Sequence, residues 1–357
     1  YGTDGNRQGE NPIPPILTTP LQRQGTLFAE MRTDQVAHYN GLNVCLQGNY
    51  TRTQGLKQQP EFPTIFEYVR RHTDFAPEKV WFIGSGIGNS IPLLSYSTHP
   101  DYGAAYGANF LAPSMAFSQK GFDELADARV YHPEFELSPM EKLTWFLNQG
   151  FPREAQQLTG LGNSPEEQYN IELFLQDMFD KTQESTVTMP LVRDNPDLQT
   201  IGYTCEVLRH FKPHLTVVNL DNVDICHGNF TSYLQNLHRA DHAVGFLWDF
   251  IQTQLPDMAA ETVLLVAPEC GRNMEPNPIR DENNWFSYDH SDENALRVFG
   301  LMAGKEVPAD LQIGQEGQPV GMTADLVPTI ADILGIKEAV SQAGFIRPNA
   351  MSWFDRL

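Results

Sequence analysis

Four apolar segments that alternate with helical patterns most strongly constrain the fold of this 357-residue chain. The segments are rich in β-branched and aromatic residues, and continuous apolar runs of this length are typical of strands buried on both faces. Amphipathic patterns at Asn195–Phe211 and Phe230–Leu255 each lead into the next apolar segment. This alternation favours an α/β fold, with a mainly parallel sheet covered by helices on both sides. The four segments are Lys79–Gly84, Leu215–Leu220, Thr262–Ala267 and Leu296–Ala303.

A different pattern occupies residues 138 to 195. Ser138-Pro139 and Ser164-Pro165 are both helix-start signals, and no strand-like segment separates them. Because the strand–helix alternation resumes afterwards, we interpret this part as a helical insertion or cap. The whole chain, residues 1–357, is then predicted to be a single domain with that cap at about 138–195.

Charge and composition limit the classes of partner. The chain has 24 basic and 45 acidic residues, a formal net charge of −21, which disfavours nucleic acid and anionic membrane and favours cation binding. No apolar run approaches the roughly 20 residues that cross a bilayer, so no membrane span is expected. The first residue is Tyr1, so we expect a removed or omitted segment, a secretory leader being one candidate. The low lysine content, the many Asn and Gln residues and the acidic balance favour an extracytoplasmic (periplasmic or secreted) location.

Cysteine spacing and a glycine-rich turn exclude two further classes of site. The four cysteines form no CxxC pair, which excludes a zinc ribbon or thioredoxin-like motif and leaves their pairing open. Gly84, Gly86 and Gly88 follow a strand but are spaced GxGxG rather than GxGxxG, so they predict a structural loop and not a nucleotide site. The cysteines are Cys45, Cys205, Cys226 and Cys270.

Carboxylates and a histidine follow the Leu215–Leu220 segment directly. Asp221, Asp224 and His227 come before the next helix, at the place where open α/β sheets bind their ligands. An Asp and a His three residues apart can converge on one ion, and carboxylate with imidazole suits zinc or a related divalent metal. The alternative is that Asp221 caps a helix and His227 packs.

Two more groups of ligand-type residues lie at the edges of predicted strands. Glu269, Cys270 and Arg272 follow the Thr262–Ala267 segment, and His290 precedes the Leu296–Ala303 segment. Because these three groups of ligand-type residues all lie at strand edges, we predict that they form one shared metal centre. By contrast, the "HRADH" sequence at residues 238–242 lies inside an amphipathic helical pattern without the glutamate of a zinc-protease helix, and we interpret it as a solvated helical face.

The order of these motifs resembles the alkaline phosphatase, sulfatase and phosphodiesterase superfamily. The resemblance implies a three-layer α/β/α sandwich with one or two metal ions at the carboxyl edge of its sheet. It extends over nearly the whole chain. The segments that carry it are Phe62–Arg71, Asn219–Gly228, Val263–Asn273, Tyr288–Ser291 and Thr323–Ile336.

Several positions depart from the family pattern. The family's Thr, Ser or Cys nucleophile opens a helix ten residues before a glycine, and counting back from Gly48 places His38 there. His38 lacks a hydroxyl; metal binding and phosphohistidine formation are both open to it. Glu269-Cys270 replaces the family's Asp-His pair, and although both types can bind zinc, Cys270 can instead be packed, redox-active or disulfide-linked. Asp4, with Gly5 and Arg7, resembles the family's first-strand aspartate block, but the apolar strand that precedes this block in the family is missing.

Two functions follow from the resemblance. The first is a metal-dependent hydrolase of phosphate, phosphonate or sulfate esters, in which a divalent ion activates a water and Arg272 or His38 steadies the anionic substrate. Zinc is favoured for the ion, with manganese and calcium as alternatives. The second is a catalytically inactive homologue, a secreted structural, assembly or binding protein for which self-association is possible. The expected metal ligands are Asp221 or Asp224, His227, Glu269, Cys270 and His290.

Overall fold

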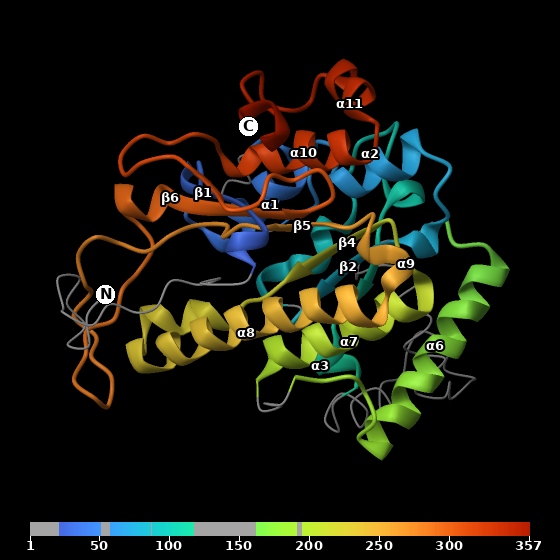
Figure 1. Cartoon of the computed structure of the whole chain (residues 1–357), viewed down its shortest axis with the longest axis horizontal. Coiled ribbons are helices and arrows are strands. Elements are labelled where there is room, and N and C mark those ends of the chain that lie inside the picture. Colours follow the sequence, from blue (N-terminus) through green and yellow to red (C-terminus); the bar gives the residue numbers. More distant parts are fainter. Residues whose placement is uncertain (1–20, 51–57, 87, 118–161, 191–194) are drawn as a thin grey trace. The chain divides into compact units, whose positions relative to one another are not determined.

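The computed structural model describes residues 21–50, 58–86, 88–117, 162–190 and 195–357 (Figure 1). The chain divides into two compact units: unit 1 combines Tyr1–Arg52 with Asp221–Leu357, and unit 2 is Thr53–Leu220. Both units combine helices with strands, and three of the five strand pairings are parallel, so the predicted α/β class is confirmed. The single-domain organisation and the cap at 138–195 stay predictions; Asp4 and residues 138–161 lie outside the described ranges.

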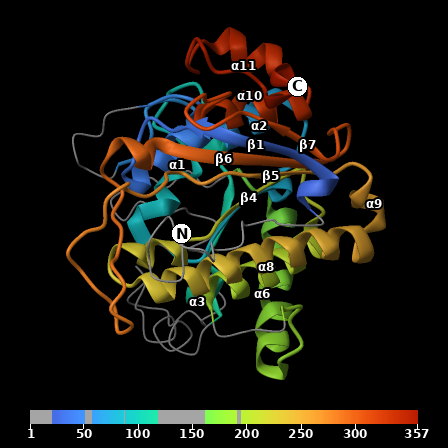
Figure 2. The same ribbon diagram turned by 60° about the vertical axis from the view of Figure 1, so that its left-hand side comes forward.

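Unit 1 is built on a four-stranded sheet in the order β5-β6-β1-β7. Strand β6 is antiparallel to both β5 and β1, whereas β1 and β7 run parallel. Figure 2 shows β1 lying along β6. The elements are β1 Gly25–Arg32, α1 His38–Gln47, α8 Phe230–Gln254, α9 Pro256–Ala259, β5 Val263–Val266, β6 Arg297–Gly304, β7 Leu311–Ile313, α10 Leu326–Ile333 and α11 Lys337–Ala343, with 3₁₀ helices η1 Gln22–Gln24, η5 Asn222–His227, η6 Glu293–Leu296, η7 Thr323–Asp325 and η8 Trp353–Arg356.

Apolar side chains cover both faces of this sheet. Leu301 and Ala303 of β6 pack in one cluster with Trp248 of α8. Met302 of the same strand packs in a second cluster with Trp353 of η8, and Leu326 of α10 packs against that cluster. In Figure 1, α8 and α10 accordingly lie on opposite sides of the strands. Because both faces are buried, the β6 sequence is a continuous apolar run instead of alternating apolar and polar residues.

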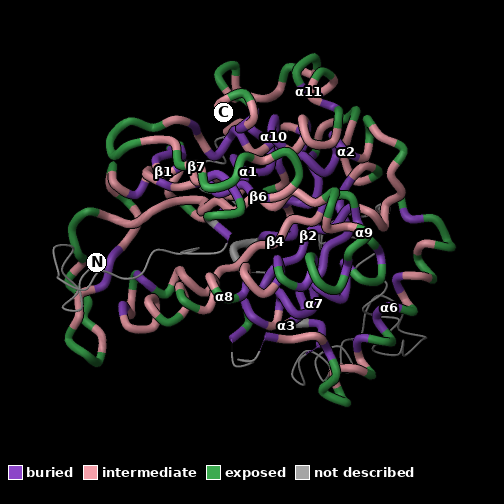
Figure 3. Tube along the Cα trace, in the orientation of Figure 1, coloured by how far each residue is buried: buried purple, intermediate pink, exposed green. Residues whose placement is uncertain are grey.

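Unit 2 contains a three-stranded parallel sheet in the order β3-β2-β4. On one face Trp81 of β2 packs with Phe174 and Phe211, which come from helices α6 and α7. On the other, Phe82 lies with its ring centroid 5.4 Å from that of Phe66 in α2. Figure 3 shows α7 buried along most of its length. The elements are α2 Ile65–His72, η2 Pro77–Lys79, β2 Val80–Gly84, η3 Gly88–Ser95, η4 Ala104–Tyr106, β3 Asn109–Leu111, α3 Pro113–Ala116, α6 Pro165–Glu184, α7 Pro196–Phe211 and β4 Leu215–Asn219.

The helix boundaries follow local signals in the sequence. Ser164 forms a capping box with Glu167 at the start of α6, as its Ser-Pro signal predicted. Asn229 caps α8 by accepting a hydrogen bond from the backbone N–H of Ser232. Helix α1 ends at Gly48, which has φ +67° and whose added Cβ would lie 3.0 Å from a neighbouring side chain. A glycine is therefore required where α1 stops.

The four predicted strands correspond to β2, β4, β5 and β6, and the segments Asn195–Phe211 and Phe230–Leu255 form α7 and α8 as predicted. Strand β1 was not predicted. All four cysteines lie in the described ranges and are free. None of the helices in the described ranges is long and apolar enough to cross a bilayer.

Candidate metal centre

Segments of unit 1 bring the predicted site residues together. Helix α1 approaches the chain after β5 so closely that a Cβ on Gly41 would lie 3.1 Å from the carbonyl oxygen of Glu269. This contact places His38, the first residue of α1, beside Glu269. The same chain is anchored to η6 because the backbone N–H of Gly271 donates to the carbonyl of Ala295 at 2.7 Å.

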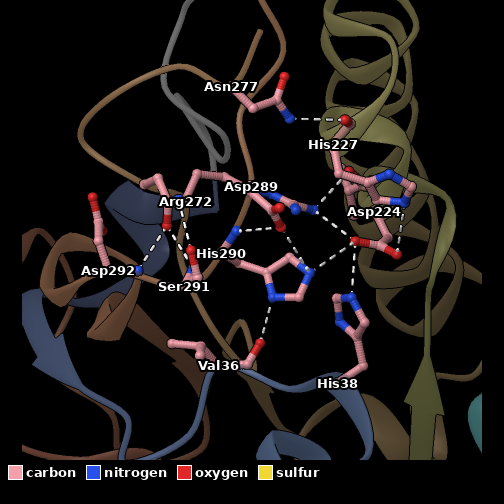
Figure 4. A network of polar contacts seen from close by, with 12 residues as sticks. Val36, His38, Asp224, His227, Arg272, Asn277, Asp289, His290, Ser291 and Asp292 are labelled. Atoms are coloured by element: carbon pink, nitrogen blue, oxygen red, sulfur yellow. Dashed lines mark hydrogen bonds and ion pairs between the residues drawn. The ribbon is translucent and has the colours of Figure 1, made fainter. Parts of the chain in front are cut away.

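His38 lies between two carboxylates. Its Nδ1 is 2.6 Å from Oε1 of Glu269. Its Nε2 is 2.9 Å from Oδ1 of Asp224, a contact drawn in Figure 4. The contacts with Asp224, Cys270 and Glu269 raise the pKa of His38 to about 12, despite the opposing effect of burial. Without a metal, His38 is therefore an imidazolium that donates from both nitrogens.

Asp224 is the residue on which the other side chains converge. Its Oδ1 accepts from Arg272 Nη2 at 3.2 Å as well as from His38, and His290 Nε2 is 3.8 Å away. Its Oδ2 lies 3.5 Å from Nε2 of His227. Burial alone would raise the pKa of Asp224, but the hydrogen bond and charge of His38 and the charge of Arg272 outweigh it and hold that pKa well below its usual range.

His290 is oriented by a backbone carbonyl. Its Nδ1 is 2.5 Å from the oxygen of Val36, so Nδ1–H donates there and the lone pair of Nε2 is directed towards Asp224. Burial, then the charges of His38 and Arg272, lower the pKa of His290. A neutral histidine whose second nitrogen is held by a carbonyl is the usual form of a metal-ligating histidine.

Arg272 provides a buried cation at the same place. Its side chain is 12% exposed, and Nη2 donates to the carbonyl of Val223 at 3.1 Å and to Asp224. Its Nη1 is buried and has no hydrogen-bond partner among the described residues. An unmade hydrogen bond of a buried group costs about 1–3 kcal/mol, and more for a charged group, so this donor is suited to an anionic ligand.

The described side chains form two groups that could hold a metal ion, and His38 belongs to both. One group is His38, Asp224 and His290, and the other is His38, Glu269 and Cys270; within each, the ligand atoms lie within 4.8 Å of one another. Neither group includes Asp221 or His227. Asp221 precedes η5, and its backbone carbonyl, not its side chain, accepts the backbone N–H of Asp224. The side chain of His227 is 50% exposed beside Asp224.

The first group fits a divalent metal by its chemistry and spacing. Two imidazole nitrogens and a carboxylate are a common set of zinc ligands, and ligand atoms at 2.0–2.1 Å around a tetrahedral zinc are roughly 3.3 Å apart. The observed separations from Asp224 Oδ1, 2.9 Å to His38 and 3.8 Å to His290, lie on either side of that value. Small side-chain shifts would therefore complete the site.

Two contributors could not be found from the sequence. The carbonyls of Val36 and Val223 orient His290 and Arg272, respectively, and a backbone carbonyl leaves no trace in residue type. His38 was found from its distance to Gly48, and it does open helix α1.

The chain was compared with known proteins. No protein-family model and no curated protein matches it. Among solved structures, it is similar to a protein of the alkaline phosphatase superfamily from Vibrio parahaemolyticus, with 13% identity and a TM-score of 0.46 over 91% of this chain and 61% of that one. It is also similar to a TAB5 alkaline phosphatase mutant with Mg bound in the M3 site, with 11% identity and a TM-score of 0.45 over 89% and 90% of the two chains.

A third similar structure is the PsFucS1 sulfatase from Pseudoalteromonas sp., with 13% identity and a TM-score of 0.43 over 93% of this chain and 66% of that one. This chain thus spans about three fifths of the Vibrio protein's length. All three structures belong, by their descriptions, to the group of proteins that the sequence motifs resemble. The likenesses are distant, and the function proposed below is carried by the chain's own side chains.

Proposed function

We propose that this protein is a divalent-metal-dependent hydrolase of phosphate, phosphonate or sulfate esters. The observation that carries the proposal is the convergence of ligand atoms from His38, Asp224 and His290 within 4.8 Å of one another. Beside them, Arg272 offers a buried Nη1 donor without a partner among the described residues. A cation site next to a buried guanidinium is the combination that an anionic ester requires.

Each side chain has a definite task in this proposal. His290 and Asp224 would hold the cation, and the carbonyl of Val36 keeps Nε2 of His290 directed at it. When bound, the cation supplies a Lewis acid that lowers the pKa of a water and polarises the ester. Arg272 would donate from Nη1 to a non-bridging oxygen of the substrate. Its burial strengthens that contact, because a charge-assisted hydrogen bond is weakly screened away from water.

His38 has a different task in the two states of the site. Without metal, its imidazolium pairs with Asp224 and Glu269. In a metal-bound site, Nε2 of His38 would release its proton to solvent and help to hold the ion, whose charge would take the place of the imidazolium charge. Because His38 stands where a hydroxyl nucleophile would be expected, we infer that a water and not the protein attacks the ester.

The same pairing favours a second candidate function. His38 and Arg272 already neutralise Asp224 and Glu269 without any metal. A chain that had lost catalysis would keep such a pairing, because even partly buried carboxylates are stabilised by partners of opposite charge. The second candidate is therefore a non-catalytic binding or structural homologue. For either function, an extracytoplasmic location remains a prediction from composition.

Metal content and turnover of the purified chain separate the two candidates. The metal-dependent hydrolase should retain zinc, manganese or calcium through gel filtration and hydrolyse at least one of aryl phosphate, aryl phosphodiester, phosphonate ester and aryl sulfate. Asp224→Asn and His290→Gln should abolish both properties. His242→Gln, on the α8 face, is the matched control and should change neither. Absence of bound metal and of turnover under every condition would leave the non-catalytic homologue.

Substrate anchoring by Arg272 has a separate signature. Arg272→Lys keeps a positive charge but removes the planar Nη1 donor. We expect KM to rise about tenfold or more, equivalent to roughly 1.4 kcal/mol, while metal content stays unchanged. An unchanged KM would show that Arg272 does not bind the anionic substrate, and it would not affect the proposed metal site.

A further inference from the structure

A cavity of about 410 Å³ lies in unit 1, apart from the side chains of the candidate metal centre. Among the described residues that line it there is neither Arg272 nor any member of the two possible metal-binding groups. Its walls come from β1, the segment after Arg272, η6, the start of β6 and residues 317–319. Small-molecule sites have volumes of roughly 300–1,000 Å³, so the cavity is large enough for a ligand of its own.

Two arginines on the cavity wall stand opposite each other. Arg32 of β1 and Arg297 of β6 are partners across the antiparallel strands, and both line the cavity. Like charges that are directly opposite in a sheet are destabilising. Arg297 is compensated, because its Nε and Nη2 donate to the two oxygens of Glu30 at 2.8 and 2.9 Å. Its Nη1 donates to Oδ1 of Asn294 at 3.2 Å, so Arg297 is held in place.

Arg32 is less completely paired than Arg297. Its Nη2 donates to Oε1 of Glu293 at 2.8 Å, the one hydrogen bond of this side chain to the described residues. The two side chains are 45% and 79% exposed, and a surface ion pair of this kind contributes little stability. The Nε and Nη1 donors of Arg32 are therefore available to an anion in the cavity. Such an anion would also reduce the repulsion between the two arginines.

The acidic side chains on the walls are already engaged. Both oxygens of Glu30 accept from Arg297, and the carboxylate of Asp292 accepts three backbone N–H groups. Glu293 pairs with Arg32 and is otherwise largely in solvent. The polar groups that remain open in the cavity are therefore donors on a cation, which favour an anionic ligand.

Met274 and Pro319 add apolar surface from two other segments of the cavity wall. Met274 is 43% exposed, and its backbone N–H donates to Asp292 at 2.7 Å, which fixes the start of its side chain at the wall. A methionine side chain is flexible and polarisable, so it adapts to aromatic and apolar groups of different shape. The cavity thus combines open cationic donors with an adaptable apolar contact.

We propose that this cavity binds a small organic anion with an aromatic or apolar body. Arg32 holds the anionic group, and Met274 contacts the body. The site goes beyond the proposed function, because it requires neither a metal ion nor turnover.

Anilinonaphthalene sulfonate, a fluorescent aryl sulfonate, is a probe of this chemical class. Titrated into the full chain with a chelator present, it should bind once per chain with blue-shifted emission. Arg32→Gln should weaken binding about tenfold or more, because the charge-assisted hydrogen bonds are lost. Met274→Gln should weaken binding and also shift the emission of the bound probe to longer wavelength. Lys305→Gln, which removes a cation from a similarly exposed ion pair of unit 1, is the control and should change neither property.

Glu293→Gln should change the affinity in the opposite direction. It frees Nη2 of Arg32 and removes a negative charge, so the probe should bind about two- to fivefold more tightly, the range that a surface ion pair supports. Equal affinities of the wild-type chain and Arg32→Gln, or no binding to the wild-type chain, would overturn the inference. So would binding of the cationic dye auramine O that Glu293→Gln abolishes, because the cavity would then be a cation site.

Arg272→Lys separates this cavity from the candidate metal centre. The variant should bind the sulfonate probe as the wild-type chain does. Loss of the probe in Arg272→Lys would place the anion at the metal centre and refute the cavity as its site. Since metal content and turnover are measured separately, this inference can fail while the proposed function stands, and the reverse.

Discussion

The metal-free protein should lose stability as the pH rises above about 6.5, because His38 holds a proton in the folded chain that it releases on unfolding. Hydrogen bonds with Asp224, Cys270 and Glu269 raise the pKa of His38 from 6.5 to about 12. A raised pKa means that this stabilisation is fully present below pH 6.5 and is lost progressively as the pH rises towards the folded pKa. One proton changes the free energy of unfolding by about 1.4 kcal/mol per pH unit, so the loss between pH 7 and pH 9 is roughly 2.7 kcal/mol.

Urea unfolding in the presence of a chelator measures this effect. The wild-type chain is compared with His38→Gln at several pH values between about 6 and 9, and the difference between their free energies of unfolding removes every titration that they share. The difference should shrink by about 1.4 kcal/mol per pH unit. With saturating Zn²⁺ the trend should disappear, since a cation then replaces the proton. A difference that stays constant with pH would show that His38 is neutral in the folded chain and would refute the imidazolium interpretation.

Three further substitutions test other contacts. Asp325→Ala should lower the free energy of unfolding by about 3–5 kcal/mol in urea titrations, because it leaves the partly buried Arg356 and two backbone donors of this fully buried carboxylate unpaired. Gly41→Ala should weaken Zn²⁺ affinity in titration calorimetry, because the added Cβ forces α1 away from Glu269. In Gly245→Ala, the added Cβ has no atom of the described residues within 4 Å, so this variant should be more stable by about 0.5–1 kcal/mol and should bind the metal unchanged. Glu67→Gln should lower the free energy of unfolding by about 1–3 kcal/mol, measured as a lower melting temperature. Both carboxylate oxygens of Glu67 accept hydrogen bonds, so the NH₂ group of a glutamine would face a donor with its own N–H.

The sequence predicted the strands whose two faces are both apolar. Strand β6 and strand β2 read as continuous apolar runs because each is covered on both sides. Strand β1 was missed because it carries Glu30 and Thr26, which look like exposed positions. Both are buried: Glu30 accepts two hydrogen bonds from Arg297, and Thr26 donates to the carbonyl of Pro308. A polar residue satisfied by a partner far along the chain cannot be recognised from its neighbours.

The sequence indicated which residues gather at the site better than which of their side chains contact one another. Their order along strand ends grouped Asp224, Glu269 and His290, and in the structure all three lie close to His38. The three-residue spacing pointed to His227 as the partner of Asp224, and His227 does lie beside it. However, Oδ1 of Asp224 meets His38, which comes from a different segment. Local spacing carries no information about that contact, since it depends on the close approach of α1 at Gly41.

Unit 1 is made of two segments of the chain, and the ribosome synthesises one of them before unit 2 and the other after it. This order affects how the protein folds in the cell. Unit 2 is continuous in sequence, so it can fold as soon as it has left the ribosome. Strand β1 must wait, because both of its neighbours, β6 and β7, come from the last sixth of the chain. At about 5–20 residues per second, this wait lasts tens of seconds. During it, β1 exposes two unpaired edges, and a chaperone that shields residues 25–32 would protect the nascent protein when it is most prone to aggregate.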